Sequence, residues 1–180
     1  GPDDLSYDST TGAVIPGSDG VREIKIFPNG LDGSLPSGNR GTVNIGSQAN
    51  STAELIDQIL NGVDCNDLAA FGGSLNFSNG PITMSGDPGI SNGMKTALTS
   101  IIGEERVILL FTNVSGTGAN TTYTIVRAVG VRVMAVSMQG ALSHRGLTVQ
   151  PASFQHPSMI PGDAPVTTYG TLYSTPRLVQ

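Results

Sequence analysis

Cysteine, histidine and tryptophan are almost missing from this chain, which has one cysteine, two histidines and no tryptophan in 180 residues. A single cysteine, Cys65, cannot form a disulfide within the chain, and its acidic neighbours disfavour a reactive thiolate. Zinc sites need several Cys or His ligands, so the same shortage argues against such a site. We therefore expect no cofactor and no metal.

Charged residues are also scarce, at 13% of the chain, and the net charge is −5. A surface of this kind repels phosphate backbones, so nucleic-acid binding is not expected. Hydrophobic residues make up 38% of the chain, and no apolar run approaches the roughly eighteen residues needed to span a bilayer. A chain of this length fits one domain with a core of its own.

The side chains on which most catalysis depends are few and far apart. A hydrolytic triad would need His144 or His156 beside a nucleophile and a carboxylate, and the chain has no Gly-x-Ser-x-Gly motif. Asp-Gly and Asn-Gly pairs recur, but none matches a calcium-binding loop, and turn chemistry explains them. We therefore expect no catalytic residue and predict that the chain is not an enzyme.

Helices are predicted where apolar residues recur three and four positions apart. The segment 51–62 opens with a capping box, in which a serine hydroxyl accepts from the amide three residues later, and an apolar face follows. A second apolar stripe predicts a helix over 91–103. A shorter helical turn is predicted near 66–71.

Several strand-like segments are found up to residue 150. The run 107–111 is apolar throughout, which predicts a central strand buried on both faces. The long segment 121–138 follows, with Gly130 as the expected bulge or bend. We expect Ile101 and Leu109 to meet in the core, where the second helix packs on the central strand. Further strands are predicted at 21–27, 42–45 and 142–150, and a small hairpin is predicted over 75–84.

This order of elements predicts an α+β fold, with a β-rich, curled or barrel-like mixed sheet and two or three short helices. The first two residues match the scar that tag cleavage leaves, and residues 1–20 are expected to form a flexible lead-in. A single domain is predicted over 21–150. Repeated prolines then predict an extended tail over 151–180.

One part of the tail, residues 166–173, has strand-like composition. Two roles compete for it: a disordered linker, or an extended strand along an open sheet edge of this chain or a neighbouring one. Tyr169 and Tyr173 would share a face of such a strand, and Pro165 and Pro176 would bound it. We favour docking, and these two tyrosines are the candidate interaction residues.

Several motifs resemble a known family when taken together in their order and spacing. The motifs are GNRGTVNIG at 38–46, GDPGIS at 86–91, RVILLF at 106–111, VSGTGAN at 114–120, YTIV at 123–126 and VGVRVM at 129–134. Over residues 21–150 they resemble the bacterial TadE/TadG-like, Flp pilus-assembly-like proteins. The resemblance implies an N-terminal transmembrane helix, upstream of the residues present here, followed by an extracytoplasmic domain. It implies no catalytic residue.

The expected function is therefore that of a non-enzymatic structural or interaction domain in a membrane-anchored protein of the cell envelope. Its expected location is the periplasm or cell surface, and its expected partners are envelope or Flp pilus-assembly proteins, or further copies of itself. The alternative is a binding module for a glycan or other surface ligand, using the Asn- and Asp-rich loops 28–40 and 113–120. An exposed apolar strip would favour the first hypothesis, and exposed tyrosines beside carboxamides in one groove would favour the second.

Overall fold

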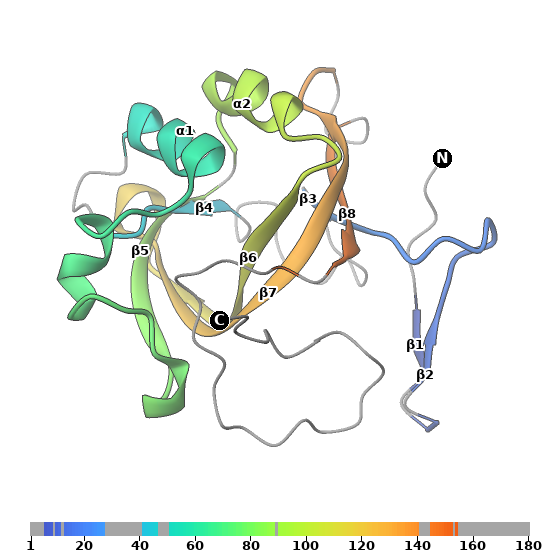
Figure 1. The fold of residues 1–180 in the computed structure, drawn as a ribbon, viewed down its shortest axis with the longest axis horizontal. Coiled ribbons are helices and arrows are strands. Elements are labelled where there is room, and N and C mark those ends of the chain that lie inside the picture. The colour runs from blue at the N-terminus through green and yellow to red at the C-terminus, as the bar shows by residue number, and fades with distance from the viewer. Residues whose placement is uncertain are drawn as a thin grey trace, which may run out of the picture.

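The computed structural model describes residues 6–8, 10–11, 13–27, 41–46, 51–88, 90–140, 145–152 and 154. Across these residues the fold is α+β, as predicted, with a six-stranded antiparallel sheet and two short α-helices (Figure 1). No helix among them has the length and apolarity to cross a membrane. The strands of the sheet are β3 (Ile24–Phe27), β4 (Gly41–Val43), β5 (Ile82–Pro88), β6 (Glu105–Ser115), β7 (Thr122–Ser137) and β8 (Gly146–Pro151).

The sheet is organised around β7, its longest strand at 16 residues. One side of β7 pairs with β6, while the other side is shared: β5 pairs with the beginning of β7 and β8 pairs with its end. β4 pairs with β5, and β3 pairs with β8. All of these pairings are antiparallel, so the prediction of a mixed sheet was wrong.

The curled or barrel-like shape is also not found, because the sheet is open. Closure would require the two edges of the sheet to pair with each other. Among the described strands β6 pairs with β7 alone, and β3 and β4 end the other side of the sheet. The two longest strands, β6 and β7, are joined by the short connection 116–121 and pair as antiparallel neighbours.

A bulge divides β7 into two parts. Leu110 of β6 lies opposite Arg127, but the next residue, Phe111, lies opposite Ile125, so Val126 is an extra residue on β7. A single extra residue reverses which side chains face which side of a sheet. Ile125 therefore shares a face with Phe111, whereas Val131 shares the opposite face with Arg106. Sequence analysis expected a bulge or bend at Gly130, which lies four residues after the extra residue Val126.

The first of two hydrophobic clusters lies under the helices, and we call it the helix core. The capping box predicted for α1 (Thr52–Asn61) is present, since the Ser51 hydroxyl accepts from the Glu54 amide at 3.1 Å. The second predicted helix is shorter than expected: a 3-10 turn, η3 (Asn92–Met94), precedes α2 (Lys95–Ser100). The buried members of the helix core are Phe27, Leu55, Met94, Leu98, Ile101, Val133 and Met138.

The second cluster, which we call the turn core, lies at the other end of β7 and is covered by turns. The predicted helical turn is confirmed as η1 (Asp67–Phe71), but the predicted hairpin over 75–84 is only half present. Its first half is the 3-10 turn η2 (Phe77–Asn79), because the Asn76 side chain accepts from the Ser78 amide and caps a turn. The buried members of the turn core are Met84, Tyr123 and Ile125, and the half-buried Leu109 and Phe111 pack against them.

Ile101 and Leu109 do not meet, contrary to prediction. Ile101 is 5% exposed in the helix core, whereas Leu109 is half-buried and packs against the turn core. The physical reason is the alternation of β6: Leu109 points to the face opposite Arg106, whose guanidinium donates to the Ile59 carbonyl of α1.

The first 20 residues contain a short two-stranded hairpin, β1 (Ser6–Asp8) and β2 (Ala13–Ile15). The Asp8 carboxylate holds the turn by accepting from the amides of Thr10 and Thr11. Sequence analysis expected a flexible lead-in over 1–20 and no strands, since strands of three residues carry too few positions to show a periodicity.

Candidate functional site

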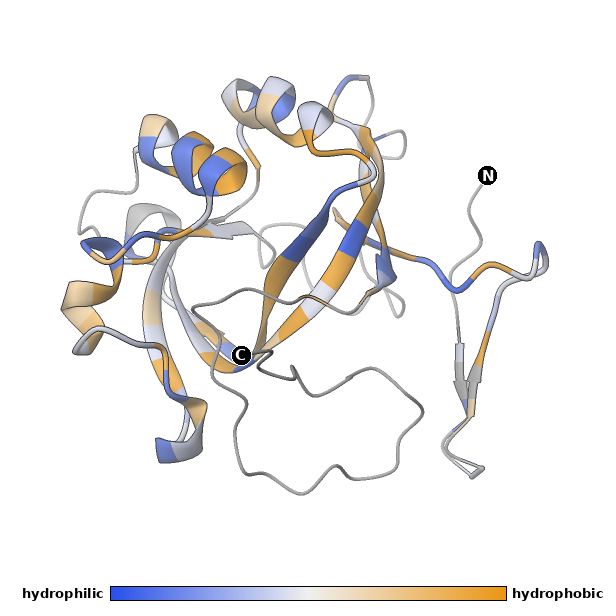
Figure 2. Cartoon of the chain, viewed as in Figure 1, coloured by the Kyte–Doolittle hydropathy of each residue, from blue (hydrophilic) through white to orange (hydrophobic). Residues whose placement is uncertain are grey.

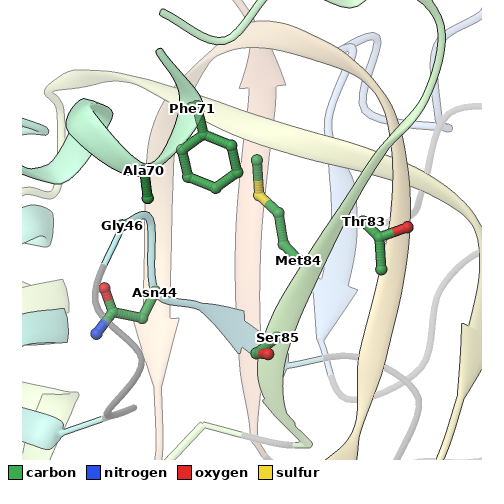
Figure 3. Close-up of a pocket in the computed structure, with 7 residues that line it drawn as sticks. All are labelled: Asn44, Gly46, Ala70, Phe71, Thr83, Met84 and Ser85. Carbon is green, nitrogen blue, oxygen red and sulfur yellow. The ribbon is translucent and has the colours of Figure 1, made fainter. Parts of the chain in front are cut away.

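A small pocket lies beside the turn core (Figure 3). β5 supplies three consecutive residues to it, η1 supplies an apolar wall, and the segment after β4 closes one side. Its volume is about 160 Å³. The residues that line it are Asn44, Gly46, Ala70, Phe71, Thr83, Met84 and Ser85.

This pocket is poorly suited to chemistry. Ligand pockets usually measure about 300–1,000 Å³, so one of about 160 Å³ holds only a very small molecule. None of its lining side chains titrates near neutral pH, so they supply neither a general acid nor a general base. The Asn44 side-chain oxygen is already engaged, since it accepts from the Gln58 side-chain amide at 3.2 Å.

Gln58 joins the two ends of the molecule. It lies on α1, which covers the helix core, and its side-chain amide donates to the Ile45 carbonyl at 2.9 Å. Its side-chain oxygen accepts from the Ile45 amide at 3.2 Å, and Ile45 packs against the turn core. We call these bonds, together with the one to Asn44, the Gln58 clamp. Sequence analysis missed it because the partners lie 13 and 14 positions apart and share no motif.

Four carboxylates gather near the start of α1: Glu54, Asp57, Asp64 and Asp67. Burial, and next the charge of Asp67, raises the pKa of Glu54. Backbone amides, first that of Asp67, donate to Asp64 and lower the pKa of that carboxyl. Within the described ranges, no three His, Cys, Asp or Glu side chains are placed to hold a metal ion. The acidic group therefore shapes a turn and is no evident binding site.

The edge formed by β6 is the most unusual surface of the sheet. β6 is 11 residues long and hydrogen-bonds only to β7 among the described strands. The strands that end the other side, β3 and β4, have four and three residues. Natural proteins keep edge strands short or charged, because a long unpaired edge invites another strand.

The composition of β6 contrasts with this position. After Glu105 and Arg106 the strand is apolar for five residues, which Figure 2 shows as a hydrophobic stretch. Sequence analysis predicted a central strand buried on both faces, and this was wrong. No residue of β6 is fully buried, and Leu110 is 41% exposed. The composition is that of a strand with two neighbours, but only one is present among the described residues.

The predicted site residues have different outcomes. Tyr169, Tyr173, His144 and His156 lie outside the described residues, as does the loop 28–40. Cys65 is exposed. The other loop of the alternative hypothesis, 113–120, is mostly exposed at the end of β6 and in η4 (Gly118–Asn120). The single tyrosine whose side chain is described, Tyr123, is only 3% exposed.

Comparison with known proteins yields no relative: no family model, no curated protein and no solved structure matches the chain. The resemblance to TadE/TadG-like proteins therefore stays a prediction from the sequence.

Proposed function

We propose that the chain is a non-enzymatic interaction domain of a membrane-anchored envelope protein, located outside the cytoplasm and linked to Flp pilus assembly or a similar surface structure. Its partners are other proteins of that assembly or further copies of the chain. The motif resemblance and the polar, weakly charged composition support the location. The small pocket, with no titratable lining residue, favours a role in contact over a role in catalysis.

The observation that carries this proposal is the open edge of β6. An extended segment of a partner can add to such an edge, gaining affinity from main-chain hydrogen bonds and specificity from alternate side chains. Val107 to Phe111 would supply an apolar surface on both faces for this purpose. Leu110, 41% exposed, would then be covered by the added strand.

The alternative of a glycan-binding module has less support. Sugar rings commonly stack on exposed aromatic rings, with carboxamides nearby to bond the hydroxyls. At the loop 113–120 the neighbouring Tyr123 is buried and packs edge-on against Phe111, with ring centroids 5.2 Å apart. The apolar run 107–111 on β6, in which Leu110 is exposed and the other four residues are half-buried, is the feature that favours a protein partner.

Site-specific photo-crosslinking in the native host tests the proposal. A photoreactive phenylalanine analogue replaces Leu110 at the edge, and the same analogue at the exposed Ser78 of η2 is the control. We expect envelope proteins, or a second copy of the chain, to be captured from position 110 and not from position 78. Equal capture from both positions, or none from position 110, would refute an assembly role for this edge.

A further inference from the structure

The sequence of β6 has a symmetrical pattern about Leu109. The apolar run 107–111 is preceded by the charged residues 105–106 and followed by the uncharged polar residues 112–113. Figure 2 shows the start of β6 as hydrophilic and the stretch after it as hydrophobic. The strand therefore presents the same order of polar and apolar residues when it is read in either direction.

A strand with this pattern can pair with a second copy of itself in the antiparallel direction. A two-fold axis perpendicular to the sheet relates the two copies, and opposite residues face the same side, so the axis passes through a residue position. With the axis at Leu109, Val107 lies opposite Phe111 of the other copy. Ile108 then lies opposite Leu110, and every member of the apolar run has an apolar partner.

The two neighbouring registers match less well. An axis at Ile108 would place the charged Arg106 opposite Leu110. An axis at Leu110 would place Val107 opposite the polar Asn113. Because the pattern of apolar and polar residues sets the register of a strand pair, the axis at Leu109 is the favoured one.

The charges at the start of β6 do not oppose this pairing. Glu105 accepts from the Arg132 guanidinium at 2.8 Å, and the Arg106 guanidinium donates to the Ile59 carbonyl at 3.2 Å. Both charged groups therefore have partners within their own chain. In the self-paired sheet they lie beside the uncharged residues 112–113 of the other copy, so no two like charges of β6 meet.

We propose that two copies of the chain pair through β6 in the antiparallel direction, with Leu109 on the two-fold axis, and so join their two six-stranded sheets into one. Proteins that avoid such pairing place lysine, proline or other charges along an edge, and the run 107–111 has none of these. The inference rests on the proposed function in its use of the β6 edge, and it names a second copy as the occupant.

Cysteine substitutions in a Cys65→Ser background test the register. Leu109→Cys places two thiols directly opposite each other, with Cβ atoms about 4.5–5.5 Å apart, so a disulfide can form. Leu110→Cys is the matched control, because its two copies are offset by two residues and their Cα atoms lie about 8 Å apart, too far for a disulfide. We expect mild oxidation to link the first variant into a dimer and not the second, although Leu110 is the more exposed side chain.

Analytical ultracentrifugation of the purified full chain tests the interface. We expect a dimer that dissociates on dilution. Leu110→Lys should weaken it at least about tenfold, because it adds a charge to the edge. Ile15→Lys is the control, since Ile15 is 47% exposed in the β1–β2 hairpin, and it should leave the dimer unchanged. Circular dichroism should show both variants folded, because both replaced side chains are exposed.

Two outcomes would overturn the inference. One is a chain that stays monomeric up to about 1 mM, where even a weak dimer would form. The other is a dimer that Leu110→Lys does not weaken, or that Leu110→Cys links as readily as Leu109→Cys, since the copies would then meet in another way. The purified chain contains no other envelope protein, so a monomer there does not decide what position 110 captures in the host. Self-pairing and the proposed function therefore fail separately.

Discussion

The helix core and the turn core use the same strand in different ways. In the helix core, β7 buries Val133 beneath α1 and α2, which hold their apolar stripes by regular backbone bonding. In the turn core, β7 buries Tyr123 and Ile125 beneath two 3-10 turns, η1 and η2, and the Asn76 side chain caps η2. One strand can serve both because the bulge at Val126 reverses its faces.

The difference teaches that the two ends are separate packing units joined at a few points. β7 is the covalent link between them. The Gln58 clamp adds an attractive link between α1 and the loop that carries Ile45. Glu54 on α1 and Asp67 in η1 add a repulsive one, because their charges are alike. Predictions about these links can test how independent the two cores are.

The largest expected effect comes from emptying each core in turn. Ile101→Ala in the helix core and Ile125→Ala in the turn core should each lower the free energy of unfolding by about 2–5 kcal/mol, since their exposures are only 5% and 1%. Because the two residues belong to different clusters, the loss of unfolding free energy in the double variant should equal the sum of the two single losses within about 0.5 kcal/mol. Urea unfolding of the single and double variants measures this.

Leu109→Ala serves as the matched comparison, because sequence analysis expected it to pack on Ile101. This substitution should lower the free energy of unfolding by less than about 2 kcal/mol, since the Leu109 side chain is half-buried at the edge of the sheet. The losses of unfolding free energy from Leu109→Ala and Ile101→Ala should add in the double variant. The losses from Leu109→Ala and Ile125→Ala should not add, because Leu109 packs against the cluster that contains Ile125. Coupling of more than about 1 kcal/mol between Leu109 and Ile101 would contradict the division into two cores.

A smaller effect is expected from cutting the Gln58 clamp. Gln58→Ala removes its hydrogen bonds to Ile45 and Asn44, which should cost about 1–3 kcal/mol. Amide exchange near Ile45 should accelerate more than exchange in α2. Asn61→Ala is the control on the same helix, since its exposed side chain bonds only within α1, to Asp57. An equal loss from both variants would mean that the clamp does not join the cores.

The contrast between the cores also explains how much of the fold could be predicted. Helical stripes recur every three or four residues, so Leu55 and Leu98 were recognisable as core residues from their neighbours alone. The turn core depends on residues far apart in the sequence, such as Phe77 and Phe111, brought together by strand pairing. No local pattern marks which apolar residues will meet in that way.

Sequence patterns were least informative about edges. The apolar run in β6 correctly predicts a strand, but it does not say whether one or both neighbours are supplied by the described part of the chain. The position of a bulge is similarly invisible, since Val126 has nothing to distinguish it from its neighbours. Gly130, where a bulge or bend was expected, pairs in register with Val107, and residues 152 and 154 approach it closely.

The smallest expected effect concerns the repulsive link. Asp67→Asn removes the neighbouring charge, so the pKa of Glu54 should fall towards its ordinary value of 4.5. Part of the rise should remain, because burial is its largest cause. Asparagine keeps an oxygen that can accept from the Asp64 amide, as Asp67 does at 2.9 Å, so the turn should persist. Carbon-detected NMR titration of the Glu54 carboxyl measures the change.

The pH dependence of stability follows with a definite sign. A carboxyl whose pKa is raised on folding binds more protons in the folded state, so the folded protein loses stability as pH rises from 4.5 through the raised pKa of Glu54. Asp67→Asn should make this loss smaller, which melting curves between about pH 4 and pH 6 can detect. Asp57→Asn is the graded control, because the charge of Asp57 raises the pKa of Glu54 less than that of Asp67 does. A larger fall in the pKa of Glu54 with Asp57→Asn than with Asp67→Asn would show that η1 does not approach α1 closely. In that case β7 and the Gln58 clamp would link the two cores, and no repulsion between Glu54 and Asp67 would oppose them.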